Sequence, residues 1–124
     1  MPFDSWDAVH FPAANIQATA TKASAGAGLR NVCNSITVTF AATATAPTAV
    51  NVSIYLIDGA SGGTAYRWGT TVSLPAVAGA TTGYTPPGLT IRGSVDTAMT
   101  LEFSAAGGAN TVESVTMSGV TERG

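Results

Sequence analysis

The sequence has 124 residues, of which 45% are hydrophobic and 10% are charged, and its net charge is −2 at pH 7. The length fits a single domain, and the apolar share is too high for intrinsic disorder. The five basic residues are scattered singly, which argues against nucleic-acid binding, and no apolar run approaches the roughly 18 residues of a membrane span.

The charged fraction, 10%, is low beside the roughly 25% of typical soluble domains. A surface of Thr, Ser, Asn, Gly and Ala repels other chains weakly, which suits a protein that spends its life assembled. A β-sandwich domain with a nearly uncharged surface, kept soluble by its hydroxyl groups, would have the same composition. Because the N-terminus is acidic and lacks an apolar central region, we expect the protein to work where it is made or to leave the cell without a signal peptide.

The first segment, residues 1–14 with the sequence MPFDSWDAVHFPAA, follows neither a period of two nor a helical period. It concentrates large side chains between two prolines, and aromatic side chains are favoured anchors at partner surfaces. We therefore expect an extended N-terminal arm that binds a partner through Phe3, Trp6, His10 and Phe11. The alternative is that this segment folds back onto its own domain.

Short segments with strand-like alternation follow, separated by turns rich in Gly, Pro or Ala, and no helical period lasts ten residues. These segments are residues 15–22, 29–40, 50–58, 65–74, 81–85, 89–91, 97–103 and 111–117. About eight strands fit the two sheets of a jelly roll, with an immunoglobulin-like sandwich as the runner-up. The sequence therefore predicts an all-β, jelly-roll-like β-sandwich of antiparallel strands over residues 15–124, preceded by the arm of residues 1–14.

The longest of these segments, residues 29–40, has an irregularity in its alternation and contains the cysteine. Residues 32–34 break the alternation of the longest segment, which predicts a β-bulge or a bend there. Cys33 is the only cysteine, so no disulfide within the chain is possible, and we expect a small buried side chain.

Groups that could support catalysis are scarce. A single His and a single Cys cannot supply a metal site, and no glycine cluster has the lysine and the following helix of a phosphate-binding loop. The one imidazole, that of His10, lies in the N-terminal segment rather than beside a candidate nucleophile. We therefore predict that the protein is not an enzyme and needs neither a cofactor nor a metal.

The strongest enzymatic candidates are Glu102 and Glu113, which flank a loop centred on Gly107 and Gly108. If this loop closed a hairpin, the two carboxylates would face each other about 5 Å apart, as in a retaining glycosidase. A jelly roll can also place consecutive strands in opposite sheets, which would separate them. Because Thr and Ser surround both positions, we favour two solvated surface glutamates.

Three aromatic residues form a second candidate site. Tyr66, Trp68 and Tyr84 could build a platform on which sugar rings stack, as in jelly-roll lectins. Tyr66 and Trp68 share strand parity with Val72 and Leu74, however, and this parity favours packing in the core.

Three phrases of the sequence are ATAPTAVNVSIYL, YLIDGASGG and TAMTLEFSAAGGANTVESVTMSG. Together they resemble small virion-associated proteins of tailed bacteriophages, among them the jelly-roll cement or decoration proteins of the head, over about residues 15–120. The resemblance implies a non-enzymatic structural protein on the outer surface of the capsid, made in the bacterial cytoplasm. Its implied partners are the major capsid protein and further copies of itself, as a homodimer or homotrimer.

The resemblance implies no individual functional residues, because this group has no motif of that kind. An alternative function is a carbohydrate-binding or adaptor module of a phage tail, neck or head fibre. In that alternative, the aromatic residues rather than the N-terminal segment would contact the partner.

Overall fold

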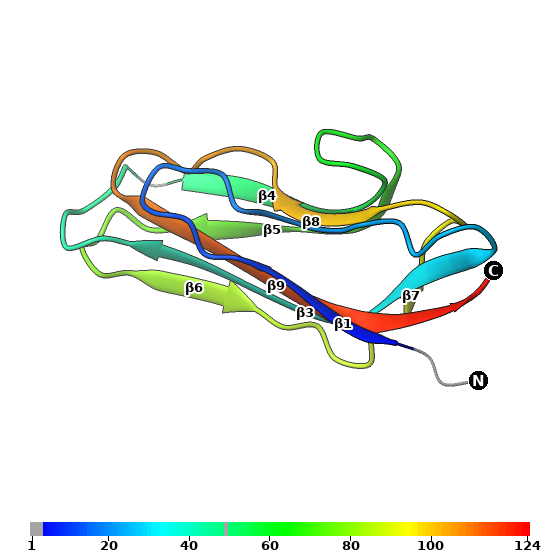
Figure 1. Ribbon diagram of the computed structural model, residues 1–124. Coiled ribbons are helices and arrows are strands. Elements are labelled where there is room, and N and C mark those ends of the chain that lie inside the picture. Colours follow the sequence, from blue (N-terminus) through cyan, green and yellow to red (C-terminus); the bar gives the residue numbers. More distant parts are fainter. Residues whose placement is uncertain (1–3, 49) are drawn as a thin grey trace.

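The computed structural model describes residues 4–48 and 50–124, and in this part of the chain all regular structure is β-strand (Figure 1). The described residues form nine strands. These are β1 (Ser5–His10), β2 (Thr19–Lys22), β3 (Leu29–Ala42), β4 (Val50–Asp58), β5 (Tyr66–Leu74), β6 (Thr81–Tyr84), β7 (Ile91–Arg92), β8 (Met99–Phe103) and β9 (Thr111–Arg123). Within the same residues, no helix has the length and apolar character needed to cross a membrane.

The strands form two antiparallel sheets packed face to face. Sheet A has the order β1-β9-β3-β6, with the short β7 also pairing with β3, and sheet B has the order β2-β8-β4-β5. The chain therefore passes from one sheet to the other at most connections, and β4 and β5 are the one consecutive pair of described strands that are neighbours in a sheet. This interleaving of two sheets, with four strands in each and the short β7 added to sheet A, is that of a jelly roll, so the predicted all-β sandwich is confirmed.

The N-terminal segment belongs to the sandwich. Residues 5–10 form β1, an edge strand that pairs with β9 from Ser5 opposite Val120 to His10 opposite Val115. The side chain of Trp6 is buried. The expected arm is corrected accordingly: over these residues the segment folds back onto its own domain, and β1 is the strand that the sequence pattern did not predict.

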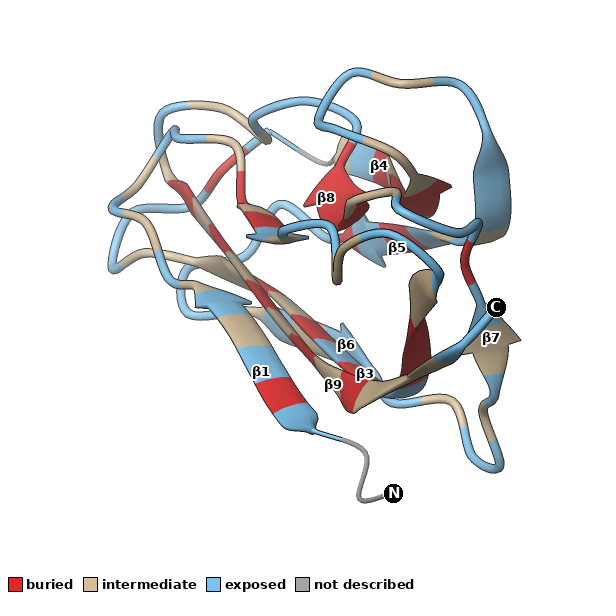
Figure 2. Cartoon of the chain, turned by 45° about the vertical axis from the view of Figure 1, so that its right-hand side comes forward, coloured by how far each residue is buried: buried red, intermediate tan, exposed pale blue. Residues whose placement is uncertain are grey.

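The core lies between the inward faces of the two sheets, where Figure 2 shows the buried stretches of the strands facing one another. Phe40 of β3 packs against Phe103 of β8, with ring centroids 5.7 Å apart. Cys33 is a free, buried thiol, as predicted, and burial raises its pKa to about 11. Large buried side chains from five strands complete the core: Ile36, Val38, Ile54, Leu56, Leu74, Met99, Leu101, Val115 and Met117.

The predicted irregularity near residues 32–34 is a β-bulge. The register between β3 and β9 shifts between Cys33 and Ser35, which leaves Asn34 without a partner. Gly119 of β9 lies opposite Cys33, and a Cβ atom added there would lie 1.8 Å from the carbonyl oxygen of Val32. The bulge thus brings two backbones closer together than any residue other than glycine allows.

A second bulge lies at the start of β5. Leu56 pairs with Trp68, and the next residue of β4, Ile57, pairs with Tyr66, so Arg67 is the extra residue. One extra residue reverses the alternation of side chains across a sheet. Trp68 therefore packs against the core, whereas Tyr66 lies on the outer face of sheet B.

Candidate functional site

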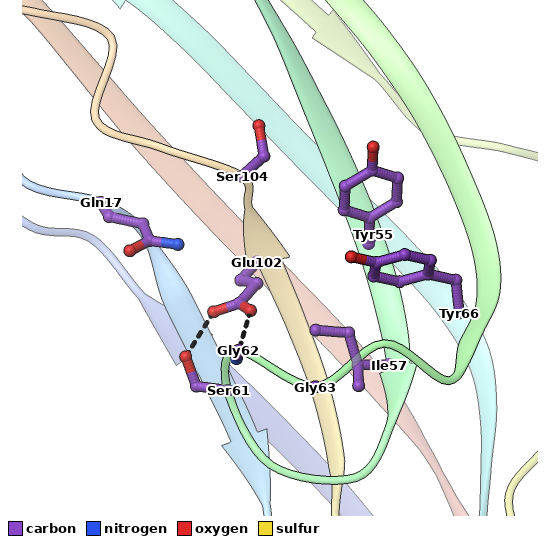
Figure 3. Close-up of a pocket in the computed structure, with 9 residues that line it drawn as sticks. All are labelled: Gln17, Tyr55, Ile57, Ser61, Gly62, Gly63, Tyr66, Glu102 and Ser104. Carbon is purple, nitrogen blue, oxygen red and sulfur yellow. Dashed lines mark hydrogen bonds between the residues drawn. The ribbon is translucent and has the colours of Figure 1, made fainter.

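The outer face of sheet B carries a pocket of about 360 Å³ near the connection between β4 and β5 (Figure 3). Its walls come from all four strands of the sheet or from residues next to them. The lining residues are Gln17, Tyr55, Ile57, Ser61, Gly62, Gly63, Tyr66, Glu102 and Ser104. Strands fix Tyr55, Ile57, Tyr66 and Glu102, and a rigid support of this kind suits a binding site.

Two stacked tyrosines form one wall of the pocket. The ring centroids of Tyr55 and Tyr66 are 4.2 Å apart and their planes are 25° from parallel. The bulge at Arg67 places Tyr66 beside Tyr55, and Gly69, the cross-strand partner of Tyr55, leaves room for the ring of Tyr55. Tyr66 remains 51% exposed, so part of this aromatic wall is open to a ligand.

The floor of the pocket is the carboxylate of Glu102 on β8, which is 5% exposed. The Ser61 hydroxyl donates a hydrogen bond to Oε2 at 2.5 Å, and the Gly62 backbone N–H donates to Oε1 at 2.9 Å (Figure 3). Both donors belong to the turn that the Gly-rich sequence DGASGG forms after β4. Gly62 adopts φ +82°, which is why this turn needs glycine there. The turn therefore holds Glu102 in one orientation.

The remaining polar walls are uncharged. The side-chain amide of Gln17 donates to the backbone carbonyl of Phe103 at 2.5 Å, which fixes Gln17 across the edge of β8. Figure 3 shows Gln17 to the left of Glu102 and Ser104 above it, with the two tyrosines on the side opposite Gln17. One N–H of the Gln17 amide is engaged in this bond, so its second N–H and its carbonyl oxygen remain for a ligand.

The two glutamates do not form a catalytic pair. Glu102 lies in sheet B and Glu113 in sheet A, the separation that a jelly roll permits. The prediction that both are solvated is wrong, because Glu113 is 1% exposed. Glu113 shares the inward face of β9 with Val115 and Met117, and its Oε1 accepts a hydrogen bond from the backbone N–H of Ala18 at 3.0 Å. Burial raises its pKa to about 7.

The predicted three-residue aromatic platform is divided between two places. Trp68 is partly buried against the core, as its parity predicted, and stacks on Tyr84 with ring centroids 6.3 Å apart. Tyr84, on β6, is 44% exposed but lines no part of the pocket. Tyr66 is the member of the three that reaches the pocket, and its partner there is Tyr55.

The candidate partner-binding residues of the N-terminal segment also differ in position. Trp6 is buried under the edge of sheet A, whereas Phe11 is 64% exposed. The His10 ring accepts a hydrogen bond from the Thr19 backbone N–H at Nδ1, at 3.0 Å. Phe3 lies outside the described residues. Of the four, Phe11 is therefore the described side chain best placed to contact a partner.

Sequence analysis did not single out three groups of the pocket: Gln17, Tyr55 and the turn at Ser61 and Gly62. The signal for Tyr55 was present, because it lies on the second face of a strand whose first face carries the core residues Val52, Ile54 and Leu56. The signal for Gln17 and the turn was absent. Their positions depend on which strands become neighbours. In the described part of the chain, no three His, Cys, Asp or Glu side chains gather as a metal site.

No protein-family model matches the sequence, and no curated protein matches it either. A solved structure described as "CBM4 structure and function" is similar to the chain, with 20% sequence identity and a TM-score of 0.42. This match covers 90% of the chain and 76% of the other protein. A likeness at this level carries no argument about ligands.

Proposed function

We propose that the protein is a non-catalytic binding module that holds a sugar in the pocket on the outer face of sheet B. The observation that carries this proposal is the half-exposed ring of Tyr66, stacked on Tyr55 beside a fixed carboxylate. A sugar ring has an apolar face of C–H groups, which packs on an electron-rich aromatic face, and a rim of hydroxyls, which need polar partners. The pocket offers both kinds of surface.

A hydrolytic role has less support. Glycoside hydrolysis uses two carboxyl groups that flank one bond, about 5–9.5 Å apart. The pocket is lined by one carboxylate, that of Glu102, while Glu113 points into the core from the other sheet. Binding of a sugar without hydrolysis is therefore the function that agrees with all the features of the site.

The test is a glycan array followed by calorimetric titration of the best ligand. We expect Tyr66→Ala to weaken binding at least tenfold, about 1.4 kcal/mol, because the exposed stacking surface is lost. Tyr84→Ala is the matched control, since it removes a tyrosine outside the pocket that is 44% exposed, against 51% for Tyr66. Binding that survives in Tyr66→Ala, or that Tyr84→Ala abolishes, would contradict the assignment of the site.

A second candidate function is the capsid decoration role that the sequence resemblance implies. What favours it is a set of exposed apolar side chains on β1 and the connection that follows it: Val9, Phe11 and Ile16 are 52%, 64% and 50% exposed. Together with the low charge, they suit attachment to a protein surface. A protein that binds only the assembled shell would stabilise it by mass action, and many symmetric copies would add avidity.

Co-sedimentation with purified phage heads that lack the protein tests this second function. Binding should saturate at a fixed number of copies per head, and the double variant Phe11→Ser, Ile16→Ser should lose it while keeping its circular dichroism spectrum. The Tyr66→Ala variant serves as the control, because its substitution lies on the other sheet. If the double variant binds heads as well as the unmodified protein, this surface is not the attachment site.

A further inference from the structure

The charges around the pocket restrict the kind of sugar that can enter it. Among the described residues that line it, Glu102 is the one carboxylate, and neither lysine nor arginine is present. The nearest arginine along the chain, Arg67, is engaged elsewhere: its Nη2 lies 2.9 Å from Oδ2 of Asp58 and 3.5 Å from the Ser94 hydroxyl. An acidic sugar would thus meet a negative charge with no positive partner to offset it.

The carboxylate of Glu102 keeps hydrogen-bonding capacity for a ligand. An ionised carboxylate has about four acceptor positions, and the Ser61 hydroxyl and the Gly62 N–H occupy one on each oxygen. The positions that remain can accept two hydroxyl protons. Hydrogen bonds of this kind are roughly twice as strong as those between neutral groups, and the fixed orientation of Glu102 reduces the entropy lost on binding.

The walls also limit how a glycan can lie. The turn carrying Ser61, Gly62 and Gly63 runs past one end of the pocket, below Glu102 in Figure 3, and the stacked tyrosines stand at the side. The volume of about 360 Å³ lies near the lower end of the roughly 300–1,000 Å³ found for small-molecule pockets. Because the turn bounds one end of the pocket, a chain end fits against it better than the middle of a long chain does.

We infer that the pocket selects the uncharged terminal ring of a glycan, and that Glu102 determines this selectivity by accepting hydrogen bonds from two ring hydroxyls. This inference rests on the proposed sugar-binding function and specifies its ligand. Tyr66 supplies the stacking surface, Glu102 accepts hydrogen bonds from the hydroxyls, and Gln17 offers its carbonyl oxygen as a further acceptor. Acidic sugars, such as uronic acids, are excluded by the charge of Glu102.

Titration with matched pairs of small probes tests the inference on the unmodified protein. The probes are the methyl glycosides of glucose, galactose and mannose, each paired with the methyl glycoside of its uronic acid: glucuronic, galacturonic or mannuronic acid. We expect at least one neutral probe to bind and its uronic counterpart to bind at least tenfold more weakly. A uronic probe that binds as tightly as its neutral partner overturns the inference while the sugar-binding function stands.

Chain length tests the terminal geometry separately. A hexasaccharide of the preferred sugar should bind within about tenfold of the methyl glycoside, because a single ring makes the contacts. A larger gain would indicate an extended groove and overturn the terminal-ring assignment. If no probe and no array glycan binds, the proposed function itself fails, which is a different outcome from either of these.

The role of Glu102 is tested by Glu102→Gln, which keeps the size of the side chain and removes its charge. The neutral probe should bind at least fivefold more weakly, and the difference between neutral and uronic probes should shrink. Ser61→Ala provides a second variant that keeps the charge but removes one of the two hydrogen bonds by which the turn orients Glu102, so it should weaken neutral binding without admitting uronic acids. Unchanged selectivity in a folded Glu102→Gln protein would remove Glu102 from this role.

Discussion

A carboxyl group in the core is the most unusual single residue of this protein. Glu113 is 1% exposed and lies opposite Phe40, on the face of β9 that points between the sheets. Its Oε1 accepts a hydrogen bond from the backbone N–H of Ala18, and its Oε2 is buried without a hydrogen-bond partner in the described structure. Glu113 therefore ties the β1–β2 connection to β9 at one end of the sandwich, at the cost of burying an ionisable group.

That cost predicts a dependence of stability on pH. Burial raises the pKa of Glu113 from 4.5 to about 7, so between these values the unfolded chain releases a proton that the folded chain keeps. Stability is therefore lost as pH rises from about 4.5 through about 7, by about 3 kcal/mol in all. Glu113→Gln keeps an acceptor for Ala18 and cannot ionise, so the variant should lose less stability over this range. Urea denaturation at pH 5 and pH 8 measures the difference.

Glu122 supplies a control of opposite sign. The side chains of Arg30 and Arg92 hydrogen-bond to its carboxylate and hold its pKa below the ordinary value. Its contribution is therefore present above the ordinary glutamate pKa and is lost as the pH falls. Glu122→Gln should lower stability at pH 8 more than at pH 4, and a Glu113→Gln protein that behaved in the same way would refute the burial argument.

Glu113 and Glu102 show how far the burial of a single residue can be predicted from the alternation of its strand. Glu113 shares parity with Val115 and Met117, which is a signal for the core, yet the Thr and Ser residues between them suggested an exposed strand. Glu102 has the opposite parity to Leu101 and Phe103 and does lie on an outer face, as the alternation predicts. It is buried because a turn more than 35 residues earlier in the chain covers it, and one strand's pattern cannot show that.

At the scale of elements, the segments with regular alternation could be predicted and the register between them could not. The eight predicted segments correspond to β2–β9, and the bulge near residues 32–34 was visible because it interrupts a long regular run. The bulge at Arg67 left no such mark. It follows from how β5 pairs with β4, and it alone moves Tyr66 from the core face to the pocket.

The missing strand has a similar explanation. In β1, Trp6, Ala8 and His10 turn toward the sandwich, but they share no apolar character that a period of two would reveal. The strand forms because β9 offers it a partner along its whole length. A terminal segment with one strong anchor was therefore mistaken for an arm, and the anchor, Trp6, was assigned to a partner instead of to the core.

At the scale of the whole molecule, the topology builds the pocket. In sheet B, β2 pairs with β8 and β8 pairs with β4, although these three strands are far apart in the sequence. Gln17, Tyr55 and Glu102 therefore meet on one face. The fold class could be predicted from short strands at regular spacing, because many such strands have few ways to bury their apolar faces. The site could not, because it exists only after distant strands have found their neighbours.

In the same topology the first strand of the chain, β1, pairs with the last, β9, at one edge of sheet A. This pairing predicts that the N-terminal segment stabilises the fold. Trp6 is 8% exposed and packs near Gly119 of β9, so Trp6→Ala should remove about 3–5 kcal/mol from the free energy of unfolding. Trp6→Phe should cost less, because it keeps an aromatic ring in the core and removes the indole N–H, which is buried without a hydrogen-bond partner in the described structure.

Phe11→Ser is the matched control for this prediction, because Phe11 follows β1 directly and is 64% exposed. Its substitution should change the free energy of unfolding by no more than about 0.5 kcal/mol. Guanidinium denaturation followed by circular dichroism gives all three values on one scale. Equal, small effects for Trp6→Ala and Phe11→Ser would mean that the segment contributes nothing to the fold. A large effect confined to Trp6 would assign the two aromatic residues separate tasks: one holds the first strand in the sandwich, and the other stays free to contact a partner.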